Sequence, residues 1–81
     1  MRFKLLPNAK NYLDTLDKET VKRIYEALRK ITKNPPIGDI KKLKGYENLY
    51  RVRIGDFRII IEIKDNNMLV EKINPRGQVY K

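Results

Sequence analysis

The sequence predicts a small α+β protein, in which an N-terminal strand and a helical hairpin pack on one face of a mostly antiparallel sheet. Three observations lead to this fold class: a short alternating stretch at the start, two stretches of helical periodicity after it, and then a run of alternating strands. With 81 residues the chain can bury one modest core. No repeat or linker divides it, so we expect a single domain over residues 1–81.

The first half predicts a strand followed by two helices. Residues 2–6 alternate apolar and basic side chains, and the proline after them suits a helix start. Residues 8–16 have the apolar spacing of a short amphipathic helix. Asp17 is a favourable N-cap for a second helix. The apolar stripe of that helix consists of Val21, Ile24, Leu28 and Ile31.

The prolines at 35 and 36 end the second helix, and residues 34–48 are expected to be the longest irregular segment. Within it lies a basic run from Lys41 to Lys44. The pattern leaves three interpretations open for this run: a solvated loop, the start of a short strand, or a contact with an anion.

Residues 48–64 predict a β-hairpin around a two-residue Gly55-Asp56 turn of type I′ or II′. A two-residue loop places Ile54 opposite Phe57 and Arg53 opposite Arg58. The apolar face must then bury against the helices; it comprises Tyr50, Val52, Ile54, Phe57, Ile59, Ile61 and Ile63. The other face is open and basic, and it carries Arg51, Arg53, Arg58, Ile60 and Glu62.

The rest of the chain predicts one further strand. Residues 65–67 form a turn, because Asp and Asn tolerate positive φ. Residues 68–73 read as a strand and residues 74–77 as a loop, and residues 78–81 are a candidate for a short last strand.

Composition limits the chemistry that this chain can perform. The formal net charge is +9, which favours polyanionic partners such as nucleic acid or an acidic protein. The chain has no Cys, His or Ser, so Ser-His-Asp and Cys-His catalysis and thiolate metal sites are excluded. No acidic cluster suggests a metal site, and we expect no cofactor. No apolar run approaches a membrane span, so a cytoplasmic protein is expected.

The arginines of the hairpin indicate a phosphate site. Like charges directly opposite each other in a sheet are destabilising, so the Arg53–Arg58 pair suggests that an anion binds over it. Arginine makes bidentate contacts to phosphate oxygens. Such a site suits RNA backbone cleavage, in which the substrate's own 2′-hydroxyl is the nucleophile. The residues alone leave RNA binding and RNA cleavage equally open.

Over nearly its whole length the chain resembles the RelE-type toxins of the RelE/ParE toxin–antitoxin superfamily. The motifs that carry the resemblance are Lys42-Leu43-Lys44-Gly45, the stretch from Leu49 to Ile60, and Arg76 with Val79-Tyr80. The resemblance implies a RelE-like βααβββ(β) fold. It also implies a ribosome-dependent endoribonuclease that cuts mRNA in the ribosomal A site without a metal, and a cognate antitoxin protein as partner.

The family pattern also implies roles for individual residues. Arg53, Arg58, Arg76 and Tyr80 would be catalytic, with the arginines stabilising charge and Tyr80 orienting the cleaved nucleotide. Contacts to RNA or to the ribosome would come from Arg51, Lys42, Lys44 and Lys81.

The chain departs from the family pattern at Pro75, where many relatives have histidine or lysine before the loop arginine. It also has arginines where some members carry lysines that act as a general base. Two alternatives therefore stay open: a ParE-like toxin that poisons DNA gyrase, and a catalytically decayed module that binds RNA or antitoxin.

Overall fold

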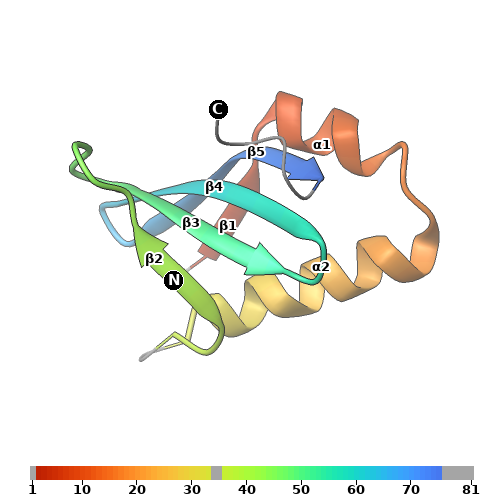
Figure 1. Ribbon diagram of the computed structural model, residues 1–81, viewed down its shortest axis with the longest axis horizontal. Coiled ribbons are helices and arrows are strands. Elements are labelled where there is room, and N and C mark those ends of the chain that lie inside the picture. The colour runs from red at the N-terminus through yellow and green to blue at the C-terminus, as the bar shows by residue number, and fades with distance from the viewer. Residues whose placement is uncertain (1, 34–35, 76–81) are drawn as a thin grey trace.

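The computed structural model describes residues 2–33 and 36–75. Its element order is β1 (Arg2–Leu5), α1 (Pro7–Leu13), α2 (Lys18–Ile31), β2 (Asp39–Lys42), β3 (Leu49–Ile54), β4 (Phe57–Lys64) and β5 (Asn67–Pro75). The strands form one five-stranded sheet in the order β1-β5-β4-β3-β2 (Figure 1). The predicted α+β class, with helices on one face of a mostly antiparallel sheet, is confirmed.

The core lies between the two helices and one face of the sheet. Leu28 and Ile24 of α2 and Ala9 of α1 are fully or almost fully buried. They pack into one cluster with the apolar side chains of the three central strands. The sheet residues of this cluster are Val52, Ile54, Ile59, Ile61, Met68, Val70 and Ile73. Removing this apolar surface from water is the main favourable term in folding.

The helices begin much as predicted, but α1 ends earlier. Asp17 caps α2, since its side chain accepts hydrogen bonds from the backbone N–H and the hydroxyl of Thr20. The same hydrogen bonds lower the pKa of Asp17. The expected helix over 8–16 stops at Leu13, although Leu16 still packs against the core. No helix among the described residues is long and apolar enough to cross a membrane.

The largest difference from the prediction is β2. Residues 34–48 were expected to be irregular, yet Asp39–Lys42 forms an edge strand antiparallel to β3. Gly38 precedes this strand at a φ of +141°, and a Cβ there would lie 2.7 Å from Ile31 Cδ1. Glycine therefore lets the chain pass closely over the end of α2 before it joins the sheet. Lys41 and Lys42 are the last two residues of this strand, so the interpretation of the basic run as a strand start is wrong about where the strand begins.

The two hairpins follow their turn residues. The φ of Gly55 is +55°, whereas the φ of Asp56 is not positive. This is the pattern of a type II′ turn. Asp65 and Asn66 both have positive φ, 54° and 62°, as a type I′ turn requires. The strand after this second turn runs from Asn67 to Pro75, longer than the predicted 68–73.

Two features of the sheet depend on long-range pairing. β1 lies parallel to β5, with Phe3 beside Met68, so the sheet is mixed. In β5 the register shifts where Ile60 pairs with Lys72 and Ile61 with Val70, which leaves Glu71 as the extra residue of a β-bulge. The suggested last strand over 78–81 lies outside the described residues.

Candidate nucleic-acid interface

The predicted arginine pair is present at the hairpin. Arg53 on β3 is the direct cross-strand partner of Arg58 on β4, next to the Ile54–Phe57 pair that closes the turn. Side chains directly opposite each other in an antiparallel pair start from Cβ atoms about 4.5–5.5 Å apart. Two guanidinium groups therefore project from neighbouring positions on the same face of the sheet, opposite to the face that the helices cover.

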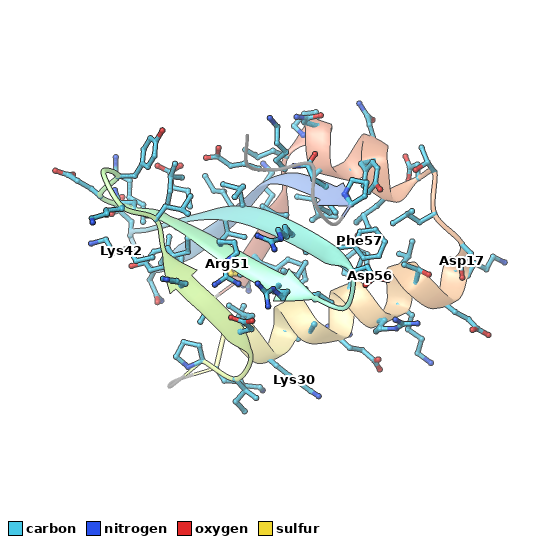
Figure 2. The ribbon with its side chains drawn as sticks, viewed as in Figure 1. Asp17, Lys30, Lys42, Arg51, Asp56 and Phe57 are labelled. Atoms are coloured by element: carbon cyan, nitrogen blue, oxygen red, sulfur yellow. The ribbon has the colours of Figure 1, made fainter. Side chains whose placement is uncertain are left out.

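Around this pair the sheet carries further cations, which we call the basic face: Lys41, Lys42, Lys44, Arg51, Arg53 and Arg58. A groove of about 400 Å³ is lined by these six residues together with Leu43. Figure 2 labels Arg51 on β3 and Lys42 at the end of β2. Lys41 is the cross-strand partner of Arg51, whereas Lys42 is the partner of Tyr50, so the side chain of Lys42 starts from the other face at the edge of the sheet. The groove runs over β2, β3, the start of β4 and the β2–β3 loop, so all of its cations except Lys44 come from strands that the sheet holds in fixed register.

A second hollow, of about 300 Å³, adjoins the hairpin turn. It is lined by Arg53, Gly55, Asp56, Phe57 and Arg58. Because Arg53 and Arg58 line both this hollow and the groove, the arginine pair stands between the two. A polyanion that lies extended in the groove would thus reach the arginine pair. The next unit along the polyanion chain would reach the hollow.

One acidic residue lies within the basic face. Asp39 of β2 is the cross-strand partner of Arg53. Its Oδ1 lies 3.2 Å from Arg51 Nη1, which donates a hydrogen bond to it, and its Oδ2 lies 3.9 Å from Arg53 Nε. Sequence reasoning missed Asp39, because its position opposite Arg53 follows only once β2 is recognised as a strand. Glu62 lies on the same face, as the alternation along the hairpin predicts.

Glu62 lies in a separate acidic pair on the same face of the sheet. It is the cross-strand partner of Leu49 and of Leu69, farther from the hairpin turn. Burial, the charge of Glu62 and a side-chain hydrogen bond with Glu62 together raise the pKa of Glu71. On the open face of the sheet, Arg58 therefore lies near the hairpin turn and the Glu62–Glu71 pair lies farther from it.

The structure brings together five of the eight site residues predicted from the sequence: Lys42, Lys44, Arg51, Arg53 and Arg58. Arg76, Tyr80 and Lys81 lie outside the described residues. Within residues 2–33 and 36–75, no group of three or more His, Cys, Asp or Glu side chains could hold a metal ion. The arrangement that remains is a groove of cations able to bind a phosphate backbone and to stabilise negative charge on it.

Comparison with known proteins shows the family. Residues 3–80 match the family model described as the ParE toxin of the type II toxin–antitoxin system parDE. The putative toxin RelE1 of Methanocaldococcus jannaschii is 35% identical over 74 residues, which cover 85% of this chain and 82% of that protein. Toxin RelE3 of the same organism is 43% identical over 42 residues, about half of each chain.

Solved structures agree with these sequence matches. The RelE–RelB complex from Pyrococcus horikoshii OT3 contains a chain that matches with a TM-score of 0.77 and 31% identity, covering 96% of this chain and 97% of that one. The isolated RelE toxin of Escherichia coli, at 15% identity, has the same fold with a TM-score of 0.76. The chain belongs to the RelE/ParE superfamily of type II toxin–antitoxin systems, as a RelE-type toxin.

Proposed function

We propose that this protein is a ribosome-dependent endoribonuclease that cuts mRNA in the ribosomal A site, and that a cognate antitoxin holds it inactive. The observation that carries the proposal is the Arg53–Arg58 pair, two cations directly opposed at the end of a basic groove. A sheet has no structural reason to oppose like charges. A phosphate bound over the pair would turn that repulsion into two favourable contacts.

The reaction needs little from the protein beyond position and charge. The 2′-hydroxyl of the substrate forms a bond to its own adjacent phosphorus, and the bond from phosphorus to the 5′-oxygen of the next nucleotide breaks. One proton leaves the 2′-oxygen and one reaches the departing 5′-oxygen. Negative charge develops on the phosphoryl oxygens, where preoriented guanidinium groups stabilise it more than they stabilise the substrate.

Each part of the basic face has a role in this proposal. Arg58 and Arg53 hold the scissile phosphate and stabilise its transition-state charge. Arg51, Lys42 and Lys44 bind neighbouring phosphates of the mRNA or the ribosomal RNA, since the groove continues over them. Arginine is a poor base because its guanidinium group stays protonated, so charge stabilisation is the role that suits Arg53.

The C-terminal residues complete the proposed site. By family pattern, Arg76 adds a further charge to the phosphate and Tyr80 orients the cleaved nucleotide, while Lys81 contacts RNA. The ribosome would supply what a site without histidine lacks, because holding the RNA in an attack geometry can itself lower the barrier by several kcal/mol, up to about 7–11.

An antitoxin partner is proposed from the relatives. Structures from Pyrococcus horikoshii and Methanococcus jannaschii that match this chain are RelE–RelB complexes. A protein with a net charge of +9 suits an acidic partner segment. Expression of this chain should therefore arrest growth, and co-expression of its antitoxin should relieve the arrest.

The decisive experiment is mRNA cleavage in a purified translation system with an empty A site. The wild type should cut inside the A-site codon only when ribosomes are present. Arg58→Ala should lose about 10²–10³-fold in rate, the usual effect of removing one donor that stabilises transition-state charge. Arg29→Ala is the matched control, because it removes the same charge from an exposed position of α2.

The alternative outcomes identify the alternative functions. A folded wild type that never cuts, but inhibits gyrase supercoiling, would be a ParE-like toxin, and the matching family model is described as a ParE toxin. A folded wild type with neither activity would be a decayed module. Equal loss of activity in Arg58→Ala and Arg29→Ala would remove the arginine site from the proposal.

A further inference from the structure

Asp39 lies within the basic face and contacts two of its arginines. Its two carboxylate oxygens face different arginines: Oδ1 lies 3.2 Å from Arg51 Nη1, and Oδ2 lies 3.9 Å from Arg53 Nε. The register explains this arrangement, because Asp39 is directly opposite Arg53 and Arg51 lies two residues away on the same face of β3. One negative group is thus shared between two of the cations that line the groove.

The two partners of the Arg51–Asp39 ion pair differ in burial. Only 13% of the Arg51 side chain is exposed, whereas half of the Asp39 side chain is exposed. Arg51 is therefore fixed in the sheet surface, while the carboxylate on the edge strand can exchange its contacts for contacts with water. The pair to Arg53 is longer, with both side chains half exposed, so it is weak.

A carboxylate and a phosphate present similar groups to arginine. Both carry negative charge on a pair of oxygens that accept hydrogen bonds from a guanidinium fork. We infer that Asp39 is an internal substitute for an RNA phosphate: it positions the Arg51 and Arg53 side chains in the empty site, and an incoming phosphate must displace it. This inference rests on the proposed RNA-binding function.

The consequence is selectivity for RNA that is already held in place. An RNA strand that is free or weakly held must compete with the Asp39 carboxylate. This carboxylate is tethered beside both arginines, so its effective concentration is high. A strand held by the ribosome has its own tether and can displace Asp39. Asp39 would thus reduce binding to unpositioned RNA by a protein whose net charge of +9 otherwise favours any polyanion.

The test compares two variants with the same charge change. Asp39→Asn removes the carboxylate from the basic face. Asp65→Asn removes a carboxylate from the β4–β5 turn. Asp65 lies seven residues after Arg58, which corresponds to a separation of roughly 23 Å along an extended strand. The measurement is the affinity of each folded protein for a single-stranded 2′-O-methyl RNA, which cannot be cleaved, over a range of salt concentrations.

We expect Asp39→Asn to bind this RNA several-fold more tightly than Asp65→Asn at low salt. Its plot of log affinity against log salt should be steeper by about 0.7, the value for one additional phosphate contact on a single strand. Equal affinities and slopes for the two variants would overturn the inference, because the carboxylate would then act only through net charge.

A second readout needs no substitution and covers a failure of Asp39→Asn to fold. In the wild type, titration with inorganic phosphate should shift the NMR resonances of the Asp39 carboxyl carbon and of Arg51 Nε together. A shift of the arginine resonance with the Asp39 resonance unchanged would show that phosphate binds without displacing the carboxylate, and the inference would fail.

The ribosome assay separates this inference from the proposed function. If the wild type cleaves mRNA but Asp39→Asn binds RNA just as Asp65→Asn does, the inference about Asp39 fails and the proposed endoribonuclease function stands. If the wild type does not cleave mRNA but the two variants show the expected difference in salt dependence, the endoribonuclease function fails. Asp39 is then the phosphate substitute of an RNA-binding module.

Discussion

The two faces of the sheet are made by alternate residues of the same strands, and they serve opposite purposes. On β4, Ile59 and Ile61 are fully buried beneath the helices, whereas the alternate residues Arg58, Ile60 and Glu62 lie on the open face. The covered face removes apolar surface from water and stabilises the fold. The open face opposes Arg53 to Arg58 and brings Glu71 beside Glu62, two arrangements of like charge.

The difference between the faces shows how a small toxin can carry a strained charge pattern. Repulsion across a strand pair costs a few tenths to about 1 kcal/mol, whereas burying one large aliphatic side chain gains about 1.5–3 kcal/mol. A dozen buried side chains in one cluster therefore stabilise the sheet enough for its other face to be shaped by ligand binding. The predictions below test this division, beginning with the largest effect.

Adjacent isoleucines on β4 give the most direct comparison of the two faces. Ile59→Ala should lower the free energy of unfolding by about 2–5 kcal/mol, because it leaves a cavity beneath the helices. Ile60→Ala makes the same chemical change on the open face, where the side chain is only half buried, and should cost less than half as much. Urea unfolding of both variants measures the difference, and equal losses would contradict the assignment of the two faces.

Arg53→Thr should affect stability and RNA binding in opposite directions. It removes the repulsion with Arg58, loses only the weak ion pair with Asp39 and introduces a residue with high strand propensity, so unfolding should require a few tenths to about 1 kcal/mol more free energy. The affinity for single-stranded RNA should fall, because a phosphate contact is lost. Urea unfolding and RNA titration test both effects. Arg53→Lys keeps the charge and serves as the control, and a less stable Arg53→Thr would show that Arg53 is structural.

The acidic pair should produce the smallest effect, visible as a dependence on pH. The folded protein raises the pKa of Glu71 above its ordinary value of 4.5, first through burial and then through the charge of Glu62. Between the ordinary and the raised pKa the folded state binds more protons than the unfolded state, so stability falls as the pH rises through this range. Below it, protonated Glu71 has no such cost.

Glu71→Gln should therefore match the wild type at acidic pH and be slightly more stable at neutral pH. Thermal unfolding measured from pH 3.5 to pH 8 would show the two curves separating as the pH rises. Glu47→Gln, in the loop before β3, controls for the change in net charge. A wild type whose stability advantage over Glu71→Gln grows with pH would contradict the sign of the shift.

Much of the fold could be predicted because its signals are local. The Asp17 cap and the stripe through Ile24 and Leu28 depend on residues three or four positions apart. The Gly55-Asp56 turn set the register of its hairpin, and with it the opposition of Arg53 and Arg58. The basic half of the candidate site followed from that register. The roles of Arg76, Tyr80 and Lys81 remain predictions outside the described residues.

The missed features depend on partners distant in the chain. Asp39–Lys42 has no strong strand pattern, and it becomes a strand because the edge of β3 offers unpaired backbone groups to it. Residues 2–5 indicate a strand but not their parallel pairing with β5. The bulge at Glu71 arises where the pairing of β4 and β5 shifts by one residue.

By itself, then, the sequence determined the fold class, the hairpin and the presence of opposed arginines, because periodicity and turn chemistry act over a few residues. Only the tertiary structure decided which strand lies beside the arginines. That choice placed the Asp39 carboxylate between Arg51 and Arg53, converting a simple cluster of cations into a site that already holds an anion. The physical reason is that the pairing of β2 with β3 and the ion pairs of Asp39 join residues eight to fourteen positions apart, which no local pattern encodes.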